Sequence, residues 1–468
     1  MTHLALAPLP ADLRPQRIAY TPAATLARRY VPHAAAFASG QDSPRAYLER
    51  CLEAMAAHEP SVRAFVTAAP GRALEAADAA SRRWREGKPL SPVDGMPVAV
   101  KDMIETTDFP TQMNSPIYRD WSSRRDAAGV WALQQAGAVI LGKTVTTEFA
   151  CSNSGPTRNP YDSTRTPGGS SSGSAAAVGS GMAALALGTQ THASTIRPAS
   201  YCGAYALKAT HGALHTGGVT PLAPTLDHLG VFGASLEDLW AGAMAIASRA
   251  GGTPPHRGMR GALVAPAASK PATLARLAMR GWQETPDSSQ AAFEAAVERL
   301  GRAGVRILDQ RTDDVVAALE REIAGLQEWS LDILAWESRW PLAAYRAHGD
   351  SQVGERIHDL LGRASSMDED RYEQALARRR TLREAVDALS GRVNGFVALA
   401  SSGPAIQDHG FTGSRSYAVP WTLVGGPAFA LPLLSADGLP LGLQLAGFAN
   451  RDEELCAIAG WVRDTLTA

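Results

Sequence analysis

Short apolar runs alternate along the chain with longer segments in which apolar residues recur at helical spacing. Residues 42–87 show the helical pattern at Tyr47, Leu48, Cys51, Leu52 and Met55. The run MPVAVKD (96–102) is short and apolar and follows a glycine, which predicts a buried strand. Further strands are expected at 138–142, 204–208, 261–265, 304–308, 395–400, 428–433 and 441–446, and further helices at 125–136, 174–188, 235–249, 288–302, 315–337, 370–389 and 452–466.

Strands that alternate with helices imply a sheet, parallel or mixed, that is covered on both faces. Residues 151–173 are rich in Ser, Thr, Asn, Pro and Gly and predict a long irregular loop. Such a loop inside a compact domain is usually functional or disordered. Residues 310–390 are the most charged and most helical part and predict an added helical layer. We therefore expect an α/β fold, an α/β/α sandwich around a large mixed sheet.

Composition bounds the function of the 468 residues. Hydrophobic residues make up 45% and charged residues 19%, which allows a large core and excludes a disordered chain. Lys+Arg number 45 and Asp+Glu 46, so no basic field exists to hold a nucleic acid. The four cysteines lie far apart without CxxC spacing, against a zinc ribbon or a disulfide framework.

The location of the protein is also predicted from the chain. The start, MTHLALAPLPADLRPQ, lacks a basic region followed by an apolar core, so no signal peptide is expected. No weakly polar run resembles a membrane span. We expect a cytoplasmic protein with neither a nucleic-acid partner nor a membrane partner.

Two short motifs match known patterns but lack the structural context that those patterns need. Residues 137–144, GAVILGKT, fit the P-loop pattern, yet the residues between the glycines indicate a strand instead of a flexible loop. Residues 169–173, GSSSG, fit a nucleophile elbow, but a turn-rich loop precedes them where a strand is needed. Nucleotide binding is disfavoured, and a Ser-His-Asp hydrolase stays open as the weaker alternative.

The window 167–203, PGGSSSGSAAAVGSGMAALALGTQTHASTIRPASYCG, is the most informative part of the chain. Its Gly/Ser content alone would indicate a flexible linker, but apolar residues at core-like spacing argue against one. The window resembles the signature of the amidase signature hydrolases, which include fatty acid amide hydrolase, malonamidase and the A subunit of glutamyl-tRNA amidotransferase. Other segments that resemble the family are GMPVAVKD (95–102), GKTVTTEFA (142–150) and the tail at 420–447, so the resemblance covers about 45–235 and 394–466.

This resemblance implies a Ser-Ser-Lys triad with Ser194 as nucleophile, Ser170 as bridging hydroxyl and Lys101 as base. A lysine, with an ordinary pKa of about 10.4, is a poor base until it loses its charge. Burial beside neutral hydroxyls would favour the uncharged form. Asp102 follows Lys101 on a strand and should point the other way. The family also implies a cis peptide bond between Gly169 and Ser170.

The implied oxyanion hole consists of the backbone amides of Thr191, His192, Ala193 and Ser194. Most family members have Gly-Gly where this chain has His192-Ala193, so either the loop is ordinary or the pocket is altered. His192 is expected either to project towards the acyl or leaving-group site or to point into a side pocket or at solvent.

Further residues are implied to support the site or to border it. Supporting roles fall to Ser171, Gln190 and Arg197. Lys143 and Lys208 are rival bases that we interpret as structural, and Trp421 and residues 148–153 are expected to border the cleft.

The resemblance as a whole implies an amidase, a hydrolase of C–N amide bonds that works through a serine acyl-enzyme. A carbamate (urethane) or ester hydrolase with the same triad remains an alternative, as does an amidotransferase component of the A type. The expected partner is a small amide-type substrate, without metal or other cofactor, and a homodimer is left open. The expected organisation is a single amidase domain over 1–468, with a helical segment at 1–90, the signature core at 91–235 and a helical insertion at 310–390 that shapes the pocket.

Overall fold

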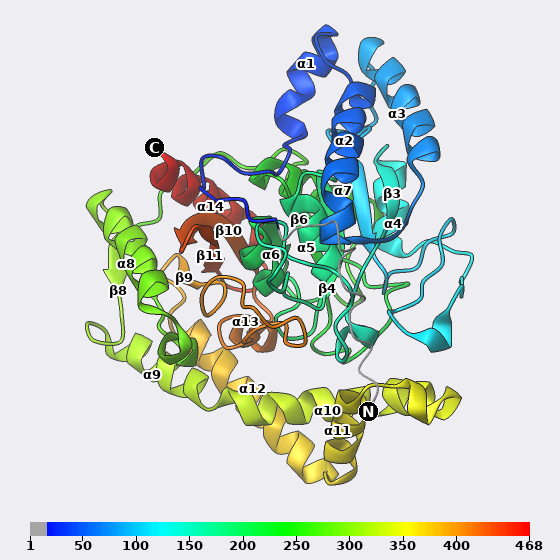
Figure 1. Ribbon diagram of the computed structural model, residues 1–468. Helices are drawn as coiled ribbons and strands as arrows, with labels where there is room; N and C mark the ends of the chain where they lie inside the picture. The colour runs from blue at the N-terminus through cyan, green and yellow to red at the C-terminus, as the bar shows by residue number, and fades with distance from the viewer. Residues whose placement is uncertain (1–15) are drawn as a thin grey trace.

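The computed structural model describes residues 16–468, and in this part of the chain eleven strands form one sheet (Figure 1). The strand order is β1-β3-β2-β4-β6-β5-β10-β11-β9-β7-β8. The strands are β1 (Phe65–Ala68), β2 (Pro97–Lys101), β3 (Val139–Thr144), β4 (Leu185–Gln190), β5 (Tyr205–Lys208), β6 (His228–Gly233), β7 (Thr273–Arg276), β8 (Arg306–Leu308), β9 (Gly395–Leu399), β10 (Ala428–Ala436) and β11 (Leu439–Ala446).

The sheet is mixed, as predicted, because β2 runs parallel to β3 and β4 whereas β4 and β6 are antiparallel. Helices cover both of its faces. In β4 the side chain of Leu187 lies against Gly129 of helix α4 (Ala128–Gln135), whereas Gly188 faces Ser171 at the start of helix α5 (Ser172–Gly179). Successive strand residues point to opposite faces, so α4 covers one face and α5 the other. The predicted sandwich is therefore confirmed.

The α-helices follow the predicted positions for the most part. They are α1 (Ala34–Ser39), α2 (Pro44–Val62), α3 (Pro70–Arg85), α4 (Ala128–Gln135), α5 (Ser172–Gly179), α6 (Ile196–Cys202), α7 (Leu236–Ala250), α8 (Asp287–Arg302), α9 (Asp314–Ala324), α10 (Leu326–His348), α11 (Glu355–Ser365), α12 (Glu369–Asp387), α13 (Val419–Val424) and α14 (Asp452–Thr467). Polar caps begin several of them. Ser43 accepts a hydrogen bond from the Ala46 N–H at the start of α2, and Asp368 accepts one from the Arg371 N–H at the start of α12.

Helices α9 to α12 pack on one another at the end of the molecule opposite α1, α2 and α3 (Figure 1). The helix predicted at 315–337 is divided at Gly325, where α9 ends and α10 begins, and α10 continues to His348. Gly325 is a poor helix former and lies at this break. Helix α11 was not predicted, although it belongs to the charged region 310–390.

Two predicted elements are wrong in whole or in part. Residues 261–265 form no strand. The helix predicted at 174–188 ends at Gly179, and the chain re-enters the sheet as β4 at Leu185. The run MAALALG is buried throughout, and a continuous apolar run does not distinguish a buried strand from a buried helix.

Strands β1, β6 and β7 were missed because they are short or fully buried, so they show no alternation of polar and apolar residues.

No helix within residues 16–468 is both long and apolar enough to cross a bilayer. The prediction about a signal peptide concerns residues 1–15, which lie outside the described part of the chain.

Candidate active site

Lys101 ends strand β2, whose five residues are all buried. Its Nζ lies 2.7 Å from Ser170 Oγ and 2.7 Å from Thr189 Oγ1. Burial lowers the pKa of Lys101 to about 7, and the negative charge of Asp227 acts in the opposite direction. Near neutral pH a large share of this side chain is therefore an uncharged amine that can accept a proton.

The two other lysines considered as bases have structural partners. Lys143 forms a buried ion pair with Asp102 at 3.0 Å and donates hydrogen bonds to Pro110 O and Thr111 Oγ1. Asp102 thus points away from Lys101, as predicted. Lys208 donates hydrogen bonds to the carbonyls of Gly426 and Ala209. Within residues 16–468, neither of these lysines has a hydrogen bond with Ser170, whereas Lys101 does.

Ser170 follows a cis peptide bond from Gly169, as the resemblance implied. The guanidinium of Arg197 donates to Gly169 O at 2.6 Å, to Gly413 O at 2.6 Å and to Thr412 Oγ1 at 2.8 Å. Arg197 therefore ties the loop before Ser170 to the loop near residue 413. The resemblance implied a supporting role for Arg197, which stays a prediction.

Ser171 and Gly188 join the loop at residues 168–171, here called the serine loop, to strand β4. Ser171 Oγ donates to Thr189 O and accepts from Thr189 N–H, both at 3.2 Å. A Cβ atom on Gly188 would lie 2.7 Å from Ser171 Oγ, so only glycine leaves room for this contact. Thr189, which also contacts Lys101, was not identified from the sequence, because nothing in its motif position distinguishes it from a structural strand residue.

Gln190 holds the loop that carries Ser194. Its Oε1 accepts the N–H groups of Thr195 (2.9 Å) and Ile196 (3.1 Å), and its Nε2 donates to Thr422 Oγ1 at 3.0 Å. The Thr422 hydroxyl then donates to His192 O at 3.0 Å. The amide is fully buried and uses both ends, so it organises the loop instead of reaching a substrate.

Asp227 holds the same loop from the position just before strand β6. It accepts a hydrogen bond from Thr191 Oγ1 at 2.6 Å and from the N–H groups of Leu222 and Ala223 at 2.8 and 3.0 Å. Burial raises its pKa to about 6. Asp227 and Thr422 lie outside the signature window, so sequence motifs could not indicate their contact with it.

Ser170 and Ser194 line one cavity of about 470 Å³, together with Thr191, His192, Ala193 and Arg197. Ala150, Cys151 and Ser152 also line it, in agreement with the prediction for residues 148–153. Trp421 does not, and its predicted place at the cleft is wrong. It is 1% exposed and packs on Phe396 with ring centroids 4.8 Å apart, as a core residue.

Comparison with known families decides the membership of the chain. The family model Amidase matches residues 46–456. The chain belongs to the amidase family. It is 32% identical to the A subunit of glutamyl-tRNA(Gln) amidotransferase of Symbiobacterium thermophilum, over 92% of this chain and 95% of that protein. It is 31% identical to the protein of the same name from Chloroflexus aggregans, over 88% and 91% of the two chains.

Solved structures agree with this membership. Native peptide amidase from Stenotrophomonas maltophilia superposes with a TM-score of 0.75 at 27% identity, over 94% of this chain and 97% of that one. A structure described as a vestigial protein complex that reveals the origins of an s-triazine catabolic enzyme gives 0.79 at 29%, over 93% and 98%. Family and neighbours together support an enzyme that hydrolyses C–N amide bonds.

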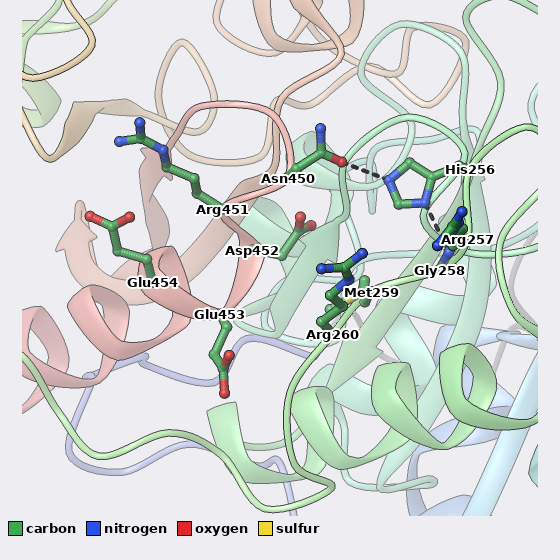
Figure 2. A pocket seen from close by; sticks show the side chains of 10 residues that line it. All are labelled: His256, Arg257, Gly258, Met259, Arg260, Asn450, Arg451, Asp452, Glu453 and Glu454. Atoms are coloured by element: carbon green, nitrogen blue, oxygen red, sulfur yellow. Dashed lines mark hydrogen bonds between the residues drawn. The ribbon is translucent and has the colours of Figure 1, made fainter.

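The protein has a second hollow, of about 570 Å³, between residues 256–260 and 450–454 (Figure 2). His256 Nε2 lies 2.8 Å from Asn450 Oδ1 there. The other side chains are arginines, acidic residues and Met259 (Figure 2). No residue of the predicted catalytic set lines this hollow, so the cavity at Ser194 is the candidate active site.

Proposed function

We propose that this amidase hydrolyses small amides by itself, through an acyl-enzyme on Ser194, with Ser170 as proton bridge and Lys101 as base. The observation that carries the proposal is the 2.7 Å contact between Lys101 Nζ and Ser170 Oγ, in a site where the pKa of Lys101 falls to about 7. A serine hydroxyl is a weak nucleophile until a neighbouring base removes its proton.

In the proposed reaction, neutral Lys101 accepts the Ser170 proton while Ser170 accepts the proton of Ser194. Ser194 Oγ bonds to the amide carbon, and the carbonyl oxygen becomes an oxyanion. The backbone N–H groups of Thr191, His192, Ala193 and Ser194 would donate to that oxygen, and one such donor is worth about 2.7–4 kcal/mol of barrier.

Collapse of the tetrahedral intermediate breaks the C–N bond, and the proton held by Lys101 returns through Ser170 to the leaving amine. A water molecule then attacks the acyl-enzyme and gives one proton to the same relay; the bond between the acyl carbon and Ser194 Oγ breaks, the relay returns that proton to Ser194, and the carboxylic acid leaves. Gln190 and Asp227 support this cycle by holding the loop that carries Ser194, and Arg197 supports it by holding the loop before Ser170.

The test is covalent labelling of the purified chain with a fluorophosphonate, followed by mass spectrometry of the peptides. We expect the label on Ser194, and none on the Ser194→Ala protein. Ser171→Ala is the matched control and should still be labelled at Ser194. A label on another residue, or label retained in Ser194→Ala, would contradict the proposal.

A second candidate function is that of an amidotransferase component of the A type. The likeness to the A subunit of glutamyl-tRNA(Gln) amidotransferase, at 32% identity over 92% of this chain, supports it. In that case a partner chain would be required for a transfer reaction. Hydrolysis of simple anilides by the purified chain alone would argue against it.

The same assay with matched ester and carbamate substrates would show which acyl compound is preferred, since all three pass through the same tetrahedral chemistry.

A further inference from the structure

The cavity around Ser194 carries more positive than negative side chains. Its charged lining residues are Arg197, Arg280, Arg356, Arg415, Glu284 and Glu328. Within residues 16–468, none of these four arginines forms an ion pair with a carboxylate of the chain. Arg197 is buried and Arg415 is partly buried, and charged groups that are removed from water are normally paired, so the state of these two needs an explanation.

The acidic residues near the cavity are engaged with other partners. Glu328 lies 3.5 Å from Arg363. Glu284 accepts hydrogen bonds from Ser414 at 2.6 Å and Ser416 at 3.2 Å. Glu148, beside the start of α11, accepts the N–H of Gly354 at 3.1 Å. Among the described residues, no carboxylate is therefore paired with the four arginines, and the two glutamates leave an excess of positive charge in the cavity.

Arg415 is held in the cavity by neutral groups. It donates to Gln327 Oε1 at 3.2 Å and to His192 Nδ1 at 3.0 Å. Burial, and then the positive charges of Arg356 and Arg197, lower the pKa of Arg415 to about 10, although the negative charge of Glu328 acts in the opposite direction. The charged form of Arg415 is thus destabilised by its surroundings, and an anion in the cavity would relieve this.

Arg356 is the second residue of α11, is exposed, and lines the same cavity. In the part of the chain that the structure describes, no hydrogen bond or ion pair holds its guanidinium. Its charge lowers the pKa of Arg415, Arg197 and His192, each after the larger effect of burial. Arg356 is therefore near all three side chains and free to receive a ligand.

His192 explains why Arg415 lies where it does. Burial and the charge of Arg415 lower the pKa of His192 well below its ordinary value, so the ring is neutral. Its Nδ1 accepts from Arg415, which leaves the ring proton on Nε2, beside the Ser330 backbone in α10. The side chain that departs from the family's Gly-Gly pattern thus anchors Arg415 close to Ser194, which follows His192 by two residues.

We propose that Arg415 and Arg356 bind a carboxylate of the substrate, so that the preferred amides are half-amides of short dicarboxylic acids. This inference rests on the proposed function at Ser194. The guanidinium group pairs with a carboxylate through two parallel hydrogen bonds, and such charge-assisted bonds are the strong ones. Because Arg415, Arg356 and Ser194 line one cavity, a short substrate can place its carboxylate at the arginines and its amide at Ser194.

The experiment compares kcat/KM for succinamic and glutaramic acids with kcat/KM for butyramide and pentanamide, which replace the carboxylate by a methyl group. We expect kcat/KM to be about tenfold or more higher for the acids, mainly because their KM is lower. Arg356→Gln and Arg415→Gln should each reduce the acid-to-neutral ratio by about tenfold. His192→Gly should reduce it as well, because Arg415 loses its anchor.

Arg380→Gln is the matched control, since it removes one positive charge from the exposed part of α12 outside the cavity. It should leave the ratio unchanged. Equal kcat/KM for acids and neutral amides, or a ratio that the two arginine variants do not alter, would overturn the inference while leaving the amidase proposal intact.

A binding measurement keeps the inference testable if no amide in the series is hydrolysed. Calorimetry with glutarate on the Ser194→Ala protein should show binding that weakens in Ser194→Ala/Arg356→Gln. No binding of glutarate would overturn the anion site. Fluorophosphonate labelling of Ser194, which needs no carboxylate, reports separately on the proposed triad.

Discussion

Two buried lysines on neighbouring strands show how surroundings decide what one residue type does. Lys143 of β3 faces Asp102 at 3.0 Å and is one half of an ion pair. Lys101 of β2 faces the hydroxyls of Ser170 and Thr189. Hydroxyls solvate an amine without supplying a negative charge, so burial lowers the pKa of Lys101 to about 7. A side chain in this state is suited to accept and return a proton.

The pH dependence of hydrolysis should report this pKa. Below pH 7 Lys101 is mostly protonated and cannot accept the Ser170 proton, so kcat/KM should fall by about tenfold per pH unit. Above pH 7 it should reach a plateau. Lys101→Ala should lower kcat/KM by about 10²–10⁴-fold and remove this decline at low pH, the acid limb of the profile. If the acid limb persists in Lys101→Ala, another group is responsible for it.

Asp227 should set the position of that limb. Its negative charge stabilises the ammonium form of Lys101 and so raises the lysine pKa. In Asp227→Asn this charge is lost, the pKa of Lys101 falls, and the acid limb of kcat/KM should move to lower pH. Asp437→Asn, with the same charge change at the turn between β10 and β11, is the control. A shift to higher pH, or equal shifts in both variants, would contradict the assignment.

At the scale of elements, the small residues of α5 let this helix lie very close to neighbouring backbone. A Cβ atom on Gly173 would lie 2.2 Å from Ala64 O and 2.5 Å from Val145 N. The Gly173 N–H also donates to Val145 O at 3.0 Å. The serine loop that precedes α5 is positioned by this contact, so the packing of one helix controls the site.

Gly173→Ala should therefore destabilise the protein, because the new methyl group meets backbone atoms that cannot rotate away. Overpacking of this kind typically costs about 1–3 kcal/mol. Gly362→Ala in α11 is the matched control, since no atom lies within 4 Å of its Cβ position. It should be neutral or up to about 1 kcal/mol stabilising. Urea denaturation measures both, and equal midpoints for the two variants would contradict this account.

On the scale of the whole molecule, the site is assembled from segments that are far apart along the chain, and three of them are β2, β4 and the start of β6, which are neighbours in the sheet. Lys101 comes from β2, Thr189 and Gln190 from β4, Asp227 from the residue before β6, and Thr422 from α13. The same sheet continues through β10 and β11 to β9, β7 and β8. A continuous ladder of this length joins the signature core to the part of the chain after residue 394.

This continuity predicts that residues 91–235 and 394–466 unfold together. Differential scanning calorimetry should show one main transition, and a fluorophosphonate bound at Ser194 should shift it as a whole. Two transitions separated by temperature, with only one of them moved by the label, would mean that the two parts are independent domains.

The sequence by itself determined most of the candidate chemistry, because local motifs carry it. The signature window, the strand that ends at Lys101 and the cis bond at Ser170 were all predicted from contiguous residues and the family that they resemble. The supporting place of Arg197 and the outward turn of Asp102 were also predicted, from motif position and strand alternation. The helical character of 310–390 followed from its pattern, although α11 did not.

Only the tertiary structure decided which distant residues complete the site. Asp227 and Thr422 contact the signature window from outside it, and Thr189, inside the window, contacts Lys101 of the neighbouring strand; no local pattern marks such contacts. The path from α5 into β4 was also mispredicted, since a fully buried run has no period to distinguish a strand from a helix. The arginines of the cavity are spread from Arg197 to Arg415 along the chain, and they form one positively charged lining only because the fold brings them together.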